Sequence, residues 1–182
     1  MPEGKATREN ILNAAKKVFA DMGFSKASVE IIAREANVSK SLVFWYFKNK
    51  RELIQEVVKE ILPKRIIMEC LDKDLKGEEL LRCVIRNYIN LLSDEVNKKL
   101  ALHLIDMSIT DEEYKKLYDE FCEEGLAKLA EKLFCKEPGE LEMAAMRGLH
   151  GMLICNIIRG QTSEDILTTL ALNLLKPLGL CS

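Results

Sequence analysis

Apolar residues recur along most of the chain every three or four positions, which is the period of an amphipathic helix. In the N-terminal part this pattern predicts helices over residues 7–22, 29–36 and 40–46. Gly23 follows the first of them and can end it by adopting a positive φ, and Ser39 can cap the third. The N-terminal part is therefore predicted to consist of three consecutive helices.

The remaining apolar pattern predicts helices as far as residue 175. A long apolar stripe over residues 50–71 is interrupted at Pro63, which indicates either one kinked helix or two helices end to end. Further helices are predicted over residues 78–92, 94–107, 113–134, 140–159 and 163–175. Because the chain contains only 9 Gly and 4 Pro in 182 residues, its composition also favours helices. We expect an all-α fold of about nine helices.

The junction between the second and third predicted helices has the features of a helix-turn-helix. Ala33 is small enough to let two helices pack closely, Asn37 tolerates the left-handed conformation of a sharp turn, and Val38 can fill the core. Val43 and Phe47 lie on the inner side of the third helix. Its outer side mixes a cation, a hydroxyl and aromatic rings, a combination that suits a DNA groove.

Charge is distributed unevenly along the chain. The net charge of -2 argues against a protein that binds nucleic acid over most of its surface. Residues 1–65, however, carry 13 Lys and Arg against 8 Asp and Glu, whereas the remaining residues carry 14 against 21. The sequence therefore predicts an anion-binding head joined to an acidic body.

The chain contains six widely spaced cysteines: Cys70, Cys83, Cys122, Cys135, Cys155 and Cys181. None forms a Cys-x-x-Cys pair or has a His at ligand spacing, so we expect no metal site and no cofactor. Most lie beside apolar residues in helical patterns, and we expect them to be free core thiols in a reducing cytoplasm. No stretch approaches the ~20 apolar residues of a membrane span, and the N-terminal residues lack the apolar region of a signal peptide. We expect a cytoplasmic protein that does not contact the membrane.

Residues 7–54 resemble the DNA-binding domain of the TetR family of transcriptional regulators. The matching residues are Thr7-Arg8, Ile11-Leu12, Ala14-Ala15, Phe19, Gly23-Phe24, Ser28-Val29, Ile32-Ala33, Ala36, Val38-Ser39-Lys40, Tyr46-Phe47-Lys48-Asn49-Lys50 and Leu53. The resemblance implies a three-helix helix-turn-helix domain over residues 1–50 and a helical effector-binding and dimerisation domain over residues 51–182. It also implies a homodimer that binds double-stranded DNA at a palindromic operator.

The third predicted helix and its neighbours supply the candidates for DNA contact. Lys40 can reach a guanine or a phosphate, Ser41 can contact base or backbone, and Leu42 can contact a thymine methyl. The candidates for base reading are Lys40, Ser41, Leu42, Phe44 and Trp45. The candidates for phosphate contact are Thr7, Ser28, Tyr46, Lys48 and Lys50. Phe44 stands where the family commonly has Tyr, so one phosphate-binding hydroxyl is missing. Packing of Trp45 on a neighbouring helix and a solvated Lys48 are the alternatives.

By the same resemblance, the C-terminal part holds a cavity for a small, largely apolar effector, whose binding moves the helix after Asn49 and releases the operator. Met and aromatic side chains can line such a cavity, although each is also typical of a plain core. The candidates are Met68, Tyr88, Leu92, His103, Met107, Phe121, Met146 and His150.

The helix predicted over residues 140–159 is apolar around much of its circumference, which favours a homodimer seam built from this helix and the last one. In TetR-like proteins the corresponding two helices form a four-helix dimer bundle. The candidates for the seam are Ala144, Ala145, Gly148, Gly151, Met152, Ile166 and Leu170. An ordinary core helix in a monomer is the alternative.

These observations favour a transcriptional repressor that binds a palindromic operator as a homodimer and is released by a small apolar ligand. A TetR-like regulator controlled by a protein partner, or one without a ligand, is the alternative. A small helical enzyme is less favoured, because the chain has no Glu-x-x-His pair, no glycine-rich phosphate loop and no nucleophile motif with a base. His103 and His150 are isolated in the sequence.

Overall fold

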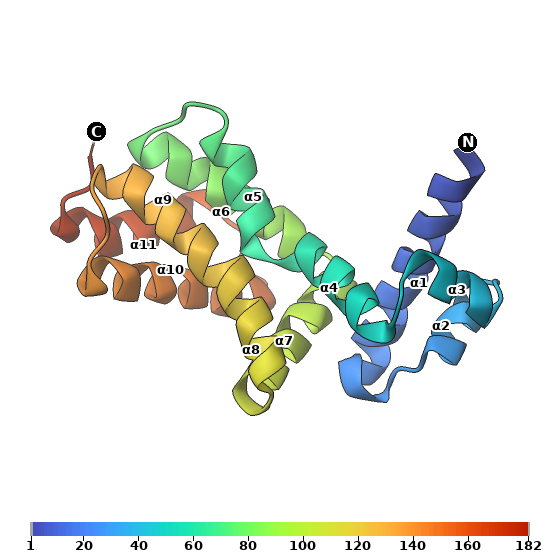
Figure 1. Ribbon diagram of the computed structural model, residues 1–182. Helices are drawn as coiled ribbons and strands as arrows, with labels where there is room; N and C mark the ends of the chain where they lie inside the picture. The colour runs from blue at the N-terminus through green and yellow to red at the C-terminus, as the bar shows by residue number, and fades with distance from the viewer. Residues whose placement is uncertain (1, 182) are drawn as a thin grey trace. The chain divides into compact units, whose positions relative to one another are not determined.

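The computed structural model describes residues 2–181, and the side chains of all of these except 2, 3 and 121. Its described residues form eleven α-helices and no strand (Figure 1). The all-α prediction is therefore confirmed. The helices group into two compact units. The first unit contains residues up to Ile61 together with Glu95–Leu117, and the second contains Leu62–Asp94 together with residues from Tyr118 onward.

The first unit is built on α1 (Pro2–Lys26), which packs against α2 (Val29–Glu35), α4 (Lys50–Ile61) and α7 (Glu95–Thr110). The short helix α3 (Lys40–Tyr46) packs on α2, and α8 (Glu112–Tyr118) contributes its residues through Leu117. Large apolar side chains fill the centre of this unit: Ile11, Phe19, Phe24, Ile32, Phe47 and Leu53. Gly23 has a φ of 76°, which interrupts α1 where the sequence predicted its end.

The second unit contains α5 (Pro63–Leu71), α6 (Gly77–Ser93), α9 (Glu124–Phe134), α10 (Glu140–Ile158) and α11 (Glu164–Leu175). Helix α9 packs on both α5 and α10, and α6 packs on α5, α10 and α11. A Cβ atom added at Gly125 of α9 would lie 3.0 Å from the Cα atom of Lys64 on α5. Only glycine therefore fits at this crossing without moving the backbone of α5.

Two of the predicted helices are divided in the structure, which raises the number from about nine to eleven. The stripe over residues 50–71 forms two helices, because Leu62 has an extended backbone (φ -97°, ψ 155°) and Pro63 begins a new helix. The predicted helix over residues 113–134 becomes α8, a π-helical turn η1 (Asp119–Glu123) and α9. A π-turn keeps helical spacing nearly unbroken, so hydrophobic periodicity does not reveal it. The functional boundary predicted after residue 50 remains a prediction.

Four of the six cysteines are paired, so the prediction that they are free core thiols is wrong for these four. Cys70 of α5 is bonded to Cys83 of α6, and Cys135, at the left-handed end of α9, is bonded to Cys181. Packing brings together residues that are 13 and 46 positions apart, and neither separation is a recognisable pairing signal. Cys122 is a buried free thiol, as predicted, and Cys155 is free but exposed.

No helix in the part of the chain that the structure describes is long and apolar enough to cross a bilayer. Among the same residues, no cluster of His, Cys, Asp or Glu side chains has the proximity that a metal ion would need.

Candidate nucleic-acid interface

The turn between α2 and α3 is fixed by local backbone interactions. Ser28 caps α2 by accepting a hydrogen bond from the Ile31 amide at 3.3 Å, and Ser39 caps α3 by accepting one from the Leu42 amide at 3.2 Å. Asn37 has a φ of 54°, the left-handed conformation expected of it. These interactions set the orientation of α3 on α2.

Helix α3 is anchored by its inner side and leaves its outer side in solvent. Val43 and the following Phe47 are each 1% exposed, as the sequence predicted. On the outer side Trp45 is 75% exposed, Phe44 is 41% exposed and Ser41 is also exposed. A ring so exposed makes little contact with its own chain beyond a T-shaped contact with the neighbouring Tyr46. Packing in the core therefore gives no reason for a tryptophan at position 45.

Lys40 is held by a carboxylate of the preceding helix. Its ammonium donates to Glu30 and lies 5.7 Å from the centre of the Phe44 ring. The hydrogen bond from Lys40 is the main reason that the pKa of Glu30 is lowered. In this state the cation is partly neutralised, so DNA phosphates or bases must compete with Glu30 for it.

The candidate phosphate-contacting residues lie around the ends of α1, α2 and α4. Tyr46 is half-buried beside α1, where a Cβ atom added at Gly4 would lie 3.4 Å from its hydroxyl. Lys48 is exposed in the loop before α4, and the Lys50 ammonium donates to the Ser25 carbonyl at 3.1 Å. Thr7, the remaining candidate for phosphate contact, lies on α1.

The start of α4 is closed by a reciprocal cap. Asn49 accepts a hydrogen bond from the Glu52 amide at 2.9 Å, and Glu52 accepts one from the Lys48 amide at 2.8 Å. The cap leaves the side chain of Lys50, in the first turn of α4, beside a small pocket of the first unit.

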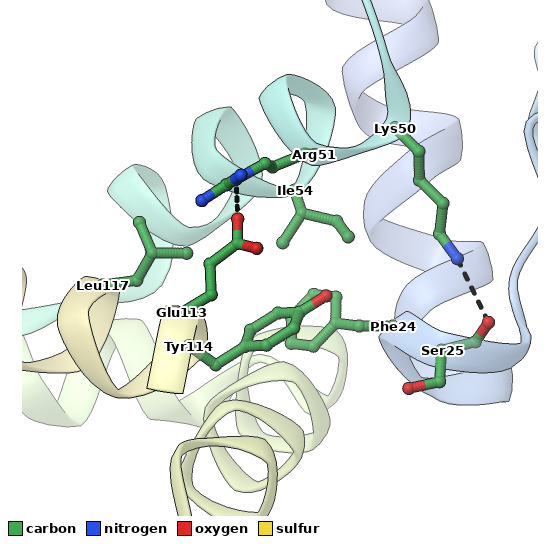
Figure 2. A pocket seen from close by; sticks show the side chains of 8 residues that line it. All are labelled: Phe24, Ser25, Lys50, Arg51, Ile54, Glu113, Tyr114 and Leu117. Carbon is green, nitrogen blue, oxygen red and sulfur yellow. Dashed lines mark hydrogen bonds and ion pairs between the residues drawn. The ribbon is translucent and has the colours of Figure 1, made fainter. Parts of the chain in front are cut away.

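That pocket, of about 260 Å³, lies between the end of α1 and the starts of α4 and α8 (Figure 2). Figure 2 shows the rings of Phe24 and Tyr114 against each other, and their planes are 26° apart. Across the pocket Arg51 forms an ion pair with Glu113. Burial lowers the pKa of Lys50, whose ammonium reaches Ser25. These contacts fix the start of α4 within the first unit, and sequence spacing alone does not reveal them.

Among the candidate ligand residues, the structure brings together Tyr88 of α6 and His150 of α10. The Tyr88 hydroxyl and His150 Nδ1 are 2.8 Å apart, and both side chains are buried. Burial lowers the pKa of His150 to about 4, so its imidazole is neutral at pH 7. Burial also raises the pKa of Tyr88 well above its usual value. The pair is therefore an uncharged polar group inside an apolar helical unit.

Two further polar side chains of this region were not among the candidates. The ring of Tyr118 lies 6.4 Å from that of His150, and its hydroxyl forms a hydrogen bond with Cys122 in the π-turn η1. Burial raises the pKa of Cys122 to about 12. The sequence classed Cys122 as a core residue and gave no signal for Tyr118, because the turn that places them is invisible to periodicity.

The other candidate ligand residues are dispersed. In the second unit Leu92 and Met146 are buried and Met68 is half-buried. His103 and Met107 belong to the first unit, where His103 Nε2 lies 3.2 Å from the Ala20 carbonyl and Met107 contacts Ser25. The side chain of Phe121 lies outside the described residues. His103 and Met107 therefore lie outside the unit that contains Tyr88 and His150.

Most of the candidate seam residues lie on exposed faces of α10 and α11. Ala144, Gly148 and Gly151 form an exposed stripe along α10, with Met152 half-buried beside it, whereas Ala145 is buried. On α11, large apolar side chains are left in solvent: Ile166, Leu170 and Leu174. A Cβ atom added at Gly148 would lie 3.8 Å from Leu174, so the two stripes are adjacent.

Comparison with known proteins gives matches in both sequence and structure. Residues 11–57 match the family model of bacterial regulatory proteins, tetR family. The transcriptional regulator SrpR of Pseudomonas putida is 41% identical over 56 residues, which are 31% of this chain and 26% of SrpR. The fatty acid metabolism regulator protein of Bacillus subtilis is 31% identical over 98 residues, which are 52% of this chain and 50% of that protein. The chain thus spans half or less of the length of these relatives.

Solved structures resemble nearly the whole chain. A transcriptional regulator of Pseudomonas aeruginosa has a TM-score of 0.75 and 17% sequence identity, and the matched region covers 98% of this chain and 91% of that regulator. The regulator FadR of Bacillus subtilis, solved in complex with stearoyl-CoA, has a TM-score of 0.69 and 22% identity, covering 93% and 96%. At these identities the likeness concerns the fold alone.

The α2–turn–α3 geometry, with its cation and exposed rings on one outer face, defines a helix-turn-helix DNA-binding protein. The matches then identify the kind of helix-turn-helix protein. Residues 11–57 form a helix-turn-helix segment of the tetR family of bacterial regulatory proteins, which confirms the resemblance seen in the sequence.

Proposed function

We propose that this chain is a homodimeric repressor that binds a palindromic operator through α3 and is released by a small, largely apolar ligand held in the second unit. The observation that carries the DNA-binding part is the outer face of α3, where Lys40, Phe44 and Trp45 stand free of the core within the TetR-like segment. A helix that is anchored by one side and presents cations and rings on the other suits a major groove.

Within this proposal, Lys40, Ser41, Leu42, Phe44 and Trp45 contact base edges. Lys40 supplies donors for guanine or phosphate, and the apolar side chains contact thymine methyl groups. Phosphates are bound by a second set of residues around the helix ends: Thr7, Ser28, Tyr46, Lys48 and Lys50. Phosphate contacts set the register of the protein on DNA, and base contacts select the sequence.

Dimerisation is supported by the exposed apolar face on α10 and α11. Gly151 has no atom within 4 Å of an added Cβ, so packing within this chain does not require glycine there. On α11, Leu170 and Leu174 remain in solvent, with Leu174 beside Gly148, and such exposure is unfavourable for a monomer. Small residues next to exposed leucines fit a close helix crossing with a second copy of the chain. Two copies supply the two DNA-binding helices that a palindromic site needs.

Control by an apolar ligand is supported by the buried Tyr88–His150 pair in the second unit. Most ligand sites combine apolar walls with a few polar groups that orient the ligand. The FadR structure that resembles this chain was solved with stearoyl-CoA, a molecule with a long apolar chain. Release of the operator then requires only that the ligand binds one of two conformations more tightly.

The DNA-binding part is tested by selecting DNA from a random pool with the purified protein and measuring affinity by gel shift. The variant with Lys40→Ala, Leu42→Ala and Trp45→Ala loses sequence-specific binding, whereas Lys132→Ala, which removes a cation of the second unit, does not. Glu30→Gln frees Lys40 from its carboxylate and tightens binding. Lys50→Ala weakens binding to all sequences alike and reduces the salt slope by about one unit. Full specific binding by the triple variant contradicts the assignment of α3.

A further inference from the structure

His150 has a buried nitrogen atom without a hydrogen-bond partner. The residue is 7% exposed, and its Nδ1 atom is engaged with Tyr88 at 2.8 Å, but no described group bonds its Nε2 atom. Thr168 Oγ1 is the other such atom among the described side chains. Buried polar groups in native proteins nearly always have a partner, which is a protein group, an ordered water or a ligand.

The bond to Tyr88 indicates which form of the imidazole is present. A neutral imidazole carries one proton, so one ring nitrogen donates and the other accepts. If the Tyr88 hydroxyl donates to Nδ1, only the Nε2–H donor remains unpaired. If Nδ1–H donates to Tyr88 instead, both the Tyr88 proton and Nε2 remain unpaired. The first arrangement leaves fewer buried groups unsatisfied, so Nε2 carries the proton and requires an acceptor.

The surroundings of this donor disfavour an ionised acceptor. Burial lowers the pKa of His150 to about 4, which shows that its site resists positive charge on the ring. The Tyr118 hydroxyl and the Cys122 thiol are likewise uncharged at pH 7, because burial raises the pKa of both groups. The Glu123 carboxylate, which acts on the His150 ring, forms an ion pair with Arg147 at 2.8 Å, so the charge of Arg147 is already neutralised by Glu123. A buried anion here would therefore lack a compensating cation.

We propose that His150 Nε2–H is the donor that selects the effector, and that the effector is an apolar molecule carrying an uncharged oxygen acceptor, such as the carbonyl of a ketone, an ester or a thioester. The proposal rests on the proposed function, because it names the chemical group that the second unit recognises. Tyr88 then acts as a positioning residue, since its hydroxyl holds the imidazole in the donating form.

Two probes of nearly identical shape test this role: 2-decanone, and 2-methyl-1-decene, in which a methylene group replaces the carbonyl oxygen. Both are titrated against the full-length protein, and binding is measured by displacement of the apolar dye Nile red. The wild type prefers the ketone by roughly 3- to 10-fold, the ratio expected for one hydrogen bond. His150→Phe abolishes this preference. His103→Phe, which replaces the other histidine in the first unit, retains it.

A second measurement needs no variant. Because the chain has only two histidines, nitrogen-15 NMR of histidine-labelled protein resolves both imidazoles. The free protein shows His150 neutral with the proton on Nε2, and 2-decanone shifts the Nε2 resonance more than the alkene does. Sodium decanoate, the charged probe, binds more weakly than the ketone.

The outcomes separate the two proposals. If the wild type binds both uncharged probes equally, or if the proton lies on Nδ1, the role of His150 is wrong while an apolar effector site remains supported. Tighter binding of decanoate likewise overturns the uncharged-acceptor class. If neither probe displaces the dye, both the effector site and the role of His150 are wrong, whereas the gel-shift test of DNA binding is unaffected.

Discussion

Replacing Leu170 with Asp on α11 should convert the proposed homodimer into monomers. The exposed apolar face contains Ile166, Leu170 and Leu174, which are 49%, 42% and 39% exposed. Since full burial of such a side chain contributes about 1.5–3 kcal/mol, covering the exposed fractions of all three in both protomers contributes roughly 4–8 kcal/mol. That amount is a large part of the free energy of a micromolar dimer.

Leu170→Asp removes one of these contributions from each protomer, roughly 1–2.5 kcal/mol in total. It also places two carboxylates in the interface, each of which loses its hydration without gaining a partner. Together these effects weaken the dimer on the order of 100-fold or more. Light scattering after size exclusion, at micromolar protein, should then report the monomer mass, and circular dichroism should report an unchanged helix content.

Leu102→Asp is the matched control. Leu102 lies on α7 in the first unit and is 46% exposed, so it has nearly the same exposure as Leu170 without belonging to the proposed seam. This variant should remain dimeric. A wild type that is monomeric at micromolar concentration, or a Leu170→Asp protein that keeps the dimer mass, would refute the reasoning.

Three further predictions concern the second unit. Gly125→Ala should lower the free energy of unfolding by about 1–3 kcal/mol in urea titrations, because its Cβ would meet the backbone of Lys64; equal or higher stability contradicts the close crossing of α5 and α9. The pKa of His150 is about 4 in the folded protein and 6.5 when unperturbed, so the unfolded state binds the proton more readily. The neutral His150 ring therefore contributes fully to the free energy of unfolding above pH 6.5, and roughly 3 kcal/mol of that free energy is lost as the pH falls toward 4. The His150→Phe variant should show a smaller loss of unfolding free energy over this pH range. An unchanged slope contradicts the assignment. Thiol titration of the unfolded protein without reductant should count two groups, Cys122 and Cys155, and six after reduction, whereas six before reduction would show that the disulfides are absent.

The sequence by itself determined the N-terminal helix-turn-helix, because the residues that specify its helices and turn are close together in the sequence. Capping by Ser39, the left-handed Asn37 and the inward Val43 each depend on residues within one or two turns, and all three were predictable. The apolar stripe over residues 50–71 likewise showed an interruption at Pro63. Local patterns of this kind determine the backbone conformation of a helix or turn and the side of the helix that is buried.

Only the tertiary structure decided the features that depend on distant residues. The Cys70–Cys83 and Cys135–Cys181 bonds, and the contact between Tyr88 and His150, join helices whose packing no local pattern specifies. Sequence reasoning selected Tyr88 and His150 as separate candidates but did not pair them. Periodicity shows which side of a helix is buried and leaves open which helix covers it, and that choice is made by packing of the whole unit.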